Sequence, residues 1–378
     1  MSNSPVAAKP YIGGQAVLEG VMMRAPTSFA IVVRRKDGSL HVRERAIADE
    51  RTGLRKLPLV RGVASLVESL KLGSEALRFS AEQYEKDFDT EAPKPKATNV
   101  LSVLKGLSLI VFMLATRADD EEASGAAKPD VKEEKKESKG GMGLMMIVSL
   151  LFFIALPQAA AAGMNKALHL NLDVQAPVFQ AMTGAFKLMI VVGYLLVIRR
   201  VPDIYRVFQY HGAEHKTIST YEAGEALTVQ NARTKTTLHP RCGTTFLVMV
   251  ALVSIFVFTG VGALLPRIHT GSALLDNVVF FFEKLPFVPA IAAVTFELQR
   301  VFARYFTKGL LRVVLLPGFL VQKITTIEPD DEQLEVALGS LRTTLFREEG
   351  TEPDASVIER KFPGYGDLLD ARQLRGAT

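Results

Sequence analysis

The chain has 378 residues, of which 48% are hydrophobic and 22% charged, with a net charge of +5. A positive mean hydropathy (+0.19) beside so many charges requires apolar and charged residues to be segregated, which indicates membrane spans joined by charged loops. The single cysteine, Cys242, excludes an intramolecular disulfide framework and an iron–sulfur ligand set. The pI of about 9.1 is weak evidence for nucleic-acid binding, which we do not expect, and is normal for a membrane protein.

The first hundred residues predict a small cytoplasmic α+β unit. The N-terminus lacks the apolar core of a signal peptide. Residues 28–47 predict a β-hairpin around Asp37-Gly38, and residues 11–24 a further strand. Apolar positions at helical spacing predict one or two amphipathic helices over 58–85.

Residues 101–142 predict a connecting region. The apolar run 101–115 is short and contains Lys105, so we expect an interfacial helix on the membrane surface. The mixed charges of residues 117–141 predict a disordered linker, because such a composition cannot bury enough apolar surface.

The membrane domain is predicted over residues 143–325, with about four transmembrane helices. The runs 143–163, 178–198 and 244–266 are long and almost free of charge, and about 20 apolar residues cross a bilayer core of roughly 30 Å. A shorter fourth candidate is 285–298. Residues 310–321, interrupted by charge and proline, are expected in the interface.

Basic residues predict the orientation. The loop 199–243 holds seven Lys and Arg residues, 164–177 holds one and 267–284 holds two. Since cytoplasmic loops are enriched in Lys and Arg, we expect 199–243 and both termini in the cytoplasm, with membrane lipids as partners.

Residues 326–378 predict a cytoplasmic C-terminal helix and tail. Asp330 and Gln333 have the spacing of a capping box, and Leu334, Leu338 and Leu341 form an apolar stripe. The polar residues 347–378 are expected to be a loosely held tail. The fold class is therefore mainly α: a polytopic helical membrane protein with a small N-terminal α+β unit.

The cytoplasmic loop contains His211-Gly-Ala-Glu214-His215, an HxxEH pattern. Two histidines at i and i+4 share one face of a helix and can bind one metal ion. Glu214 is placed to accept a proton from activated water. His211 and His215 also lie on an apolar stripe of this helix, so their imidazoles need buried partners.

Further candidate ligands follow in the sequence His239-Pro-Arg-Cys242. A closed site with His211, His215, His239 and Cys242 is structural, whereas three ligands and an open position are catalytic. Alternatively, the histidines are core residues hydrogen-bonded to carboxylates, and Cys242 is a small buried residue. Glu222, Glu225 and Glu297 are additional carboxylate candidates. Gly13-Gly14 and Glu19-Gly20 either cradle a ligand or serve turns and close packing.

Five blocks of the sequence carry a resemblance to a known family. They are GGQAVLEGVMMR, HGAEHKTISTYE, LHPRCGTTFL, LLPG and TTIEPDDEQLEVAL. In this order they resemble the domain of unknown function 1385 family, the YqhQ-like bacterial membrane proteins, over residues 11–345. Relative to that pattern, residues 101–140 are an insertion and the chain beyond 347 an extension. Members are sometimes labelled predicted metal-dependent enzymes, which implies a role for the His, Glu and Cys blocks.

The resemblance implies a bacterial inner-membrane protein, and the leading hypothesis is a metal-dependent hydrolase on the cytoplasmic face of that membrane. Its divalent metal, expected to be zinc, is bound by His211, His215, His239 and Cys242, with Glu214 as the catalytic base. The alternative is a non-catalytic membrane scaffold or regulator, in which the same residues form a structural metal site or a hydrogen-bonded cluster. A transporter ranks third, because Lys187 is the one clear charge deep in a predicted span.

Overall fold

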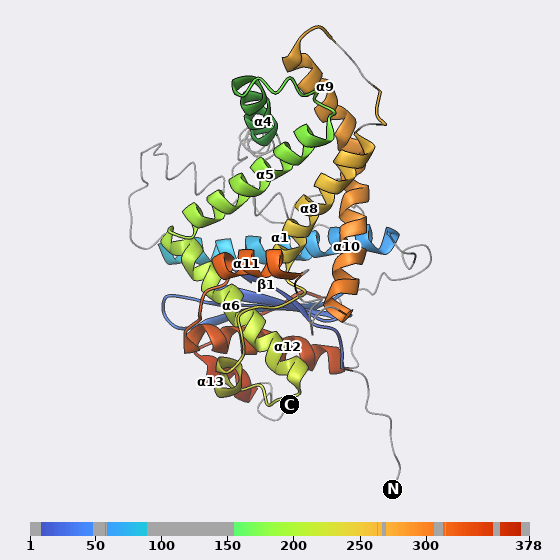
Figure 1. Cartoon of the computed structure of the whole chain (residues 1–378). Coiled ribbons are helices and arrows are strands. Elements are labelled where there is room, and N and C mark those ends of the chain that lie inside the picture. Colours follow the sequence, from blue (N-terminus) through green and yellow to red (C-terminus); the bar gives the residue numbers. More distant parts are fainter. Residues whose placement is uncertain are drawn as a thin grey trace, which may run out of the picture.

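The computed structural model describes residues 9–47, 57, 59–88, 155–262, 264–266, 270–305, 313, 315–350 and 356–371. The predicted interfacial helix, the predicted linker and most of the predicted span 143–163 lie outside these ranges. Figure 1 shows a sheet with its covering helices at one end of the molecule and long helices extending from it.

An antiparallel sheet with the strand order β1-β2-β3-β4-β5 forms the base of the fold. The strands are β1 (Gly13–Val17), β2 (Gly20–Arg24), β3 (Ser28–Arg34), β4 (Leu40–Ala46) and β5 (Ile358–Phe362). The predicted hairpin is confirmed as β3 and β4, which pair from Ser28↔Ala46 to Arg34↔Leu40. Its turn uses Gly38 at a φ of 81°, in the left-handed region that glycine adopts without strain.

Helices cover both faces of the sheet. On one face, α1 (Val60–Phe88) packs Leu72 and Phe79 against Phe29 and Ile31 of β3. On the other face lie α6 (Pro202–Ala223) and α12 (Asp331–Glu349). The predicted α+β unit therefore extends beyond residues 1–100, because helices from distant parts of the chain complete its core.

The C-terminal region is more ordered than expected. The capping box of Asp330 and Gln333 is present at the start of α12, as predicted. The expectation of a loosely held tail is wrong for residues 358–371. The strand β5 pairs with β4, and α13 (Tyr365–Ala371) buries Leu368 in the core beside α12. Cross-strand pairing and the buried side chains of Phe362 and Leu368 hold a polar segment in place.

In the part of the chain that the structure describes, three helical runs are long and apolar enough, by length and composition, to cross a membrane: Pro177–Ile198, Gly243–Val261 and Leu275–Phe302. The first two are α5 and α8, which match the predictions at 178–198 and 244–266. The third exceeds the predicted 285–298. It comprises α9 (Ala273–Lys284), the short turn η3 (Leu285–Phe287) and α10 (Val288–Tyr305), which follow one another directly. Residues 273–284 are therefore helical rather than loop.

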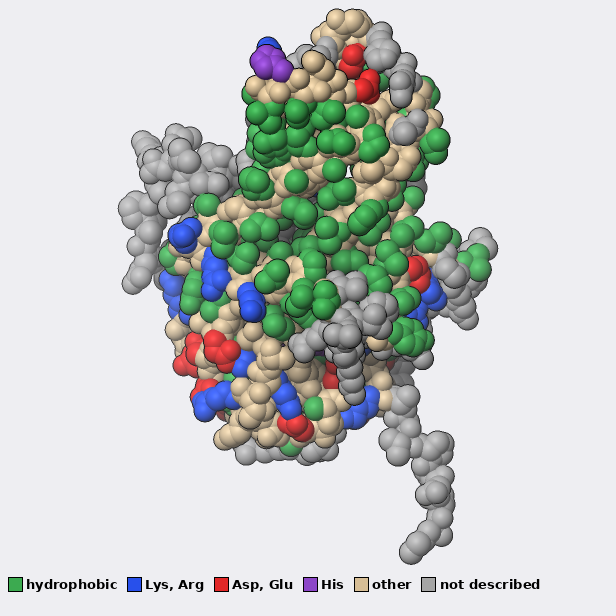
Figure 2. Space-filling model, in the orientation of Figure 1, with side chains coloured by type: hydrophobic (Ala, Val, Ile, Leu, Met, Phe, Trp, Pro, Cys, Tyr) green, Lys and Arg blue, Asp and Glu red, His purple; other side chains and the backbone are tan. Residues whose placement is uncertain are grey.

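Two shorter helices accompany these runs. Within the predicted span 143–163, the structure describes the start of α4 (Leu156–Ala167), which packs on α5. The segment expected in the interface over 310–321 contributes to α11 (Leu316–Thr325), which packs on α8 with Gly318 against Thr245. Figure 2 shows apolar side chains over the end of the molecule with the long helices, and most charged side chains over the end with the sheet.

Candidate metal centre

The helix α6 carries the HxxEH residues and is buried through its middle. It begins with Pro202 in the first turn, and it ends at Gly224, whose φ of 72° is left-handed. The Ile327 N–H donates to the carbonyl of Phe208 at 3.0 Å, so residues 325–327 run against the helix. A Cβ on Gly212 would lie 2.1 Å from the Ile327 carbonyl oxygen, and only glycine permits this approach.

The structure brings together His211, His215 and Cys242. One ligand atom from each side chain lies within 4.8 Å of the others, and the two imidazole centroids are 4.5 Å apart. Cys242 is the N-cap residue of α8 (Gly243–Val261), so its sulfur lies at the positive end of a 19-residue helix. Two imidazoles and a thiolate are a ligand set that zinc prefers.

Backbone carbonyls orient both imidazoles. His211 Nδ1–H donates to the Thr325 carbonyl at 2.9 Å, and His215 Nδ1–H donates to the Thr237 carbonyl at 2.5 Å. Because a carbonyl only accepts, the tautomer is determined, and Nε2 of each ring points into the cluster. Metal-binding histidines are characteristically held this way. His211 Nε2 lies 3.1 Å from Cys242 Sγ.

His215 Nε2 is the clearest sign that the cluster could hold a ligand. This atom is buried, and among the described residues no group meets the distance and angle of a hydrogen bond to it, although the Cys242 sulfur lies near enough to interact with the imidazole electrostatically. A buried polar atom without a partner costs about 1–3 kcal/mol. A bound cation would remove that cost, so the donor set fits a metal.

Gln322 of α11 holds the segment that carries Cys242. Its side chain is fully buried and accepts from the His239 N–H at 2.8 Å. The same amide donates to the His239 carbonyl at 2.7 Å and to Thr245 Oγ1 at 2.6 Å. One turn later, α11 supplies the Thr325 carbonyl that orients His211. Sequence reasoning missed both contacts, since neither residue belongs to a ligand pattern.

The electrostatics of the cluster favour a thiolate. Burial opposes ionisation of Cys242, but His211 and His215 outweigh it and hold the pKa of the thiol well below its usual range. Burial likewise opposes protonation of His211, yet the Cys242 sulfur outweighs this effect and raises the pKa of His211 to about 9. A cation that displaces the His211 proton would therefore meet a preformed thiolate.

Glu214 lies beside the cluster, between α6 and β1. It is 5% exposed, and burial raises the pKa of its carboxyl group while His211 and His215 lower it. A Cβ on Gly14 of β1 would lie 2.8 Å from Glu214 Oε1. The close-packing interpretation of Gly14 is thus supported, because this glycine leaves the space that the carboxylate occupies.

His239 lies next to the three-residue group but not within it. Its ring centroid is 5.6 Å from that of His215, and its Nε2 is 3.4 Å from Glu222 Oε2. Burial lowers the pKa of His239, which favours the neutral ring. Glu222 also pairs with Arg241.

The other two carboxylate candidates are engaged elsewhere. Glu225 pairs with Lys235. Glu297 of α10 makes a two-pronged ion pair with Arg61 of α1, with an Nε–Oε1 distance of 2.7 Å. These contacts give Glu225 and Glu297 structural roles outside the cluster.

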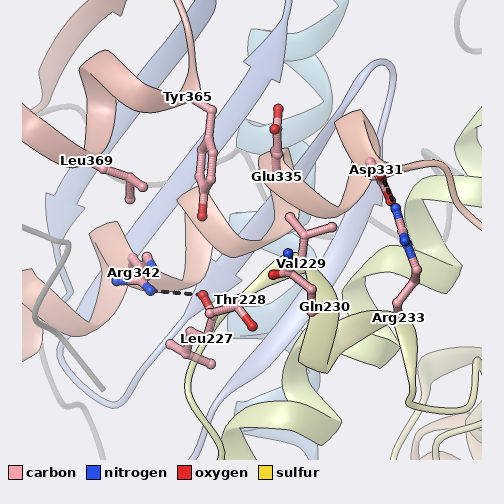
Figure 3. Close-up of a pocket in the computed structure, with 10 residues that line it drawn as sticks. All are labelled: Leu227, Thr228, Val229, Gln230, Arg233, Asp331, Glu335, Arg342, Tyr365 and Leu369. Atoms are coloured by element: carbon pink, nitrogen blue, oxygen red, sulfur yellow. Dashed lines mark hydrogen bonds and ion pairs between the residues drawn. The ribbon is translucent and has the colours of Figure 1, made fainter.

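A separate pocket of about 400 Å³ lies between α7 (Val229–Arg233), α12 and α13 (Figure 3). Arg342 on its wall donates to the Leu227 carbonyl at 2.8 Å, and Arg233 pairs with Asp331 at its rim. These contacts hold α12 against α7 and the residue Leu227 that precedes it, and none of the predicted site residues lines this pocket.

Comparison with known proteins gives two matches. The model of the family described as "Protein of unknown function (DUF1385)" matches residues 57–347. The "Uncharacterized protein YqhQ" of Bacillus subtilis (strain 168) is 30% identical over 358 residues, which cover 92% of this chain and 98% of that protein. No solved structure matches.

Proposed function

This chain belongs to the DUF1385 family, and we propose that it is a metal-dependent hydrolase at the cytoplasmic surface of a bacterial inner membrane. The observation that carries the proposal is the buried, unpartnered Nε2 of His215, which faces Cys242 and a second carbonyl-oriented imidazole. Three protein ligands leave a position open for water or substrate, which is typical of catalytic zinc.

The roles of the side chains follow from their positions. His211, His215 and Cys242 would hold the metal, and His239 would either complete the site or remain beside it. A divalent metal supplies Lewis-acid activation of water and of the scissile carbonyl. Glu214 would take the proton from water, and its raised pKa suits a group that must later return that proton near neutral pH. Gln322 would keep the Cys242 segment in register.

The packing supports a membrane topology. The sheet, α6 and α12 share one core, so all three must lie on the same side of any membrane. Between α6 and α12 the described residues contain two candidate spans, α8 and Leu275–Phe302, an even number that returns the chain to the same side. Between the sheet and α6 they contain one, α5. The further span that the sequence predicts at 143–163 would return the chain to the side of the sheet.

Reporter fusions test the topology. A fusion after residue 170 should report the outer side, and fusions after residues 225 and 345 should report the cytoplasm, because seven basic residues lie in 199–243. If the fusions after residues 225 and 345 report opposite sides of the membrane, the core shared by α6 and α12 is contradicted. A cytoplasmic signal from the fusion after residue 170 would rule out the span at 143–163.

Metal analysis tests the function. The purified full-length protein should contain about one zinc ion per chain. Its cobalt-substituted form should show a thiolate-to-cobalt charge-transfer band, because Cys242 is the only thiol in the chain. If the site is open, acetohydroxamate should shift the cobalt spectrum. An unshifted spectrum would indicate a closed structural site, the non-catalytic alternative, and absence of stoichiometric metal would refute both.

A further inference from the structure

The short helix α11 has one buried face and one exposed apolar face. The buried face packs on α5 and α8, and it supplies Gln322 and Thr325 to the candidate metal centre. The exposed face carries Leu316 and Leu320, which are 46% and 61% exposed, and Lys323. These positions, i, i+4 and i+7, share one side of an α-helix. The two leucines therefore leave an apolar surface uncovered.

The helix α11 lies at the boundary between the two ends of the molecule. Figure 1 shows it running across the long helices rather than along them, between these helices and the sheet. With 10 residues, it is too short to cross a bilayer. Figure 2 shows Lys and Arg side chains along the boundary between the apolar end and the charged end. A short amphipathic helix in this place has the arrangement of a helix that lies in the membrane interface.

Three basic side chains gather where α5 ends beside α11, and we call them the basic cluster: Arg199, Arg200 and Lys323. The two arginines follow directly after Ile198, the last residue of α5, and Lys323 lies in the last turn of α11. The Arg199 Nη1–H donates to the Lys323 carbonyl at 2.9 Å. This bond places Arg199 against the end of α11 that carries the lysine.

The charges of the basic cluster are not neutralised by the protein. The guanidinium of Arg199 bonds to a neutral carbonyl, and that of Arg200 bonds to the carbonyl of Leu196 at 3.2 Å. Within the described ranges, none of the three side chains forms an ion pair with a carboxylate. Arg206, seven residues after Arg199, does pair with Glu19. The basic cluster is therefore complementary to an anion, and the planar fork of arginine suits a phosphate.

We propose that the basic cluster binds the phosphate of an anionic phospholipid, whose acyl chains cover Leu316 and Leu320. A phospholipid supplies both parts that the surface needs, since its phosphate lies in the membrane interface and its hydrocarbon lies next to it. Basic residues beside a membrane span attract acidic lipids, whereas the cation of a zwitterionic headgroup would meet three positive charges. The proposal rests on the membrane location in the proposed function and not on hydrolysis.

The test measures phospholipid binding to the full-length protein in detergent by native mass spectrometry. The wild type should bind phosphatidylglycerol about tenfold more tightly than phosphatidylcholine, or better. The variant Arg199→Gln/Lys323→Gln should lose this preference. The matched control, Arg360→Gln/Lys361→Gln, removes the same two kinds of charge from exposed positions of β5 and should keep the preference.

Three results would overturn the proposal. The wild type could bind the two lipids equally, or Arg199→Gln/Lys323→Gln could keep the full preference for phosphatidylglycerol. An equal loss of the preference in the control variant would show attraction to the overall charge rather than a site. Displacement of the lipid by an equal concentration of glycerophosphoglycerol, its soluble headgroup, would assign the basic cluster to a soluble phosphate compound instead.

Single substitutions of Lys323 decide the matter if the double variant does not fold, because this side chain is exposed at the end of α11. Lys323→Glu should weaken phosphatidylglycerol binding about tenfold, and Lys323→Arg should bind it like the wild type. Equal binding by these two variants contradicts the proposal.

Metal analysis of the same samples separates this proposal from the hydrolase. Protein that contains zinc but does not prefer phosphatidylglycerol would refute the lipid site and leave the hydrolase standing. Protein that prefers phosphatidylglycerol but contains no zinc would support the lipid site and refute the hydrolase.

Discussion

Replacing Glu214 with glutamine is expected to leave the metal bound and to reduce hydrolysis by roughly 10²–10⁴-fold, the usual contribution of a general base. The amide has the size of the carboxylate, so it fits the space beside Gly14, but it cannot accept a proton. The measurements are zinc content by elemental analysis and hydrolysis of fluorescein-labelled β-casein and of the activated ester p-nitrophenyl acetate.

Glu225→Gln is the matched control, because Glu225 lies at the surface and pairs with Lys235 outside the cluster. It should retain both zinc and activity. A Glu214→Gln protein that hydrolyses both probes at the wild-type rate would remove Glu214 from the mechanism. Loss of zinc in that variant would instead make Glu214 a metal ligand.

Cys242→Ser should lower zinc affinity by more than about 100-fold, since even changes to groups that only support a ligand cost about 10–100-fold. A serine hydroxyl is a poor zinc ligand. In the wild type, His211 and His215 lower the pKa of the Cys242 thiol and so favour the thiolate that binds zinc. The cobalt-substituted variant should also lose the thiolate charge-transfer band. Competition with a chromophoric zinc chelator measures the affinity.

His169→Ala is the control for the loss of zinc affinity in Cys242→Ser. His169 is exposed in the turn after α4 and lies outside the cluster. It should bind zinc like the wild type. Undiminished zinc binding by Cys242→Ser would exclude the sulfur as a ligand, and the contact with His211 would then be a buried hydrogen bond.

Local patterns predicted several elements correctly because their causes are local. Asp37-Gly38 specified a hairpin, since glycine supplies the left-handed residue of the turn. Asp330 and Gln333 specified a helix start, since both partners of the capping box lie within one turn. The apolar lengths of α5 and α8 were visible as composition alone.

Distant partners account for the elements that were missed. The strand β5 has a charged sequence and exists because β4 offers its edge. The helix α9 is continuous with η3 and α10, although the sequence predicts a loop between spans over residues 267–284. Glu297 is a site candidate by residue type alone, but its ion pair with Arg61 of the distant helix α1 engages it elsewhere.

The spacing of His211 and His215 in the sequence is enough to place them on one face of a helix, with Glu214 in the same turn, because the number of residues per turn of an α-helix is constant. Packing between distant segments brings Cys242, 27 residues after His215, to these histidines and leaves His239 beside the group. This arrangement depends on Gln322, which hydrogen-bonds to the main-chain N–H and carbonyl of His239. It also depends on the carbonyls of Thr325 and Thr237, which orient the imidazoles of His211 and His215 so that their Nε2 atoms face the cluster. Backbone carbonyls are the same in every residue type, so no sequence pattern could have identified them.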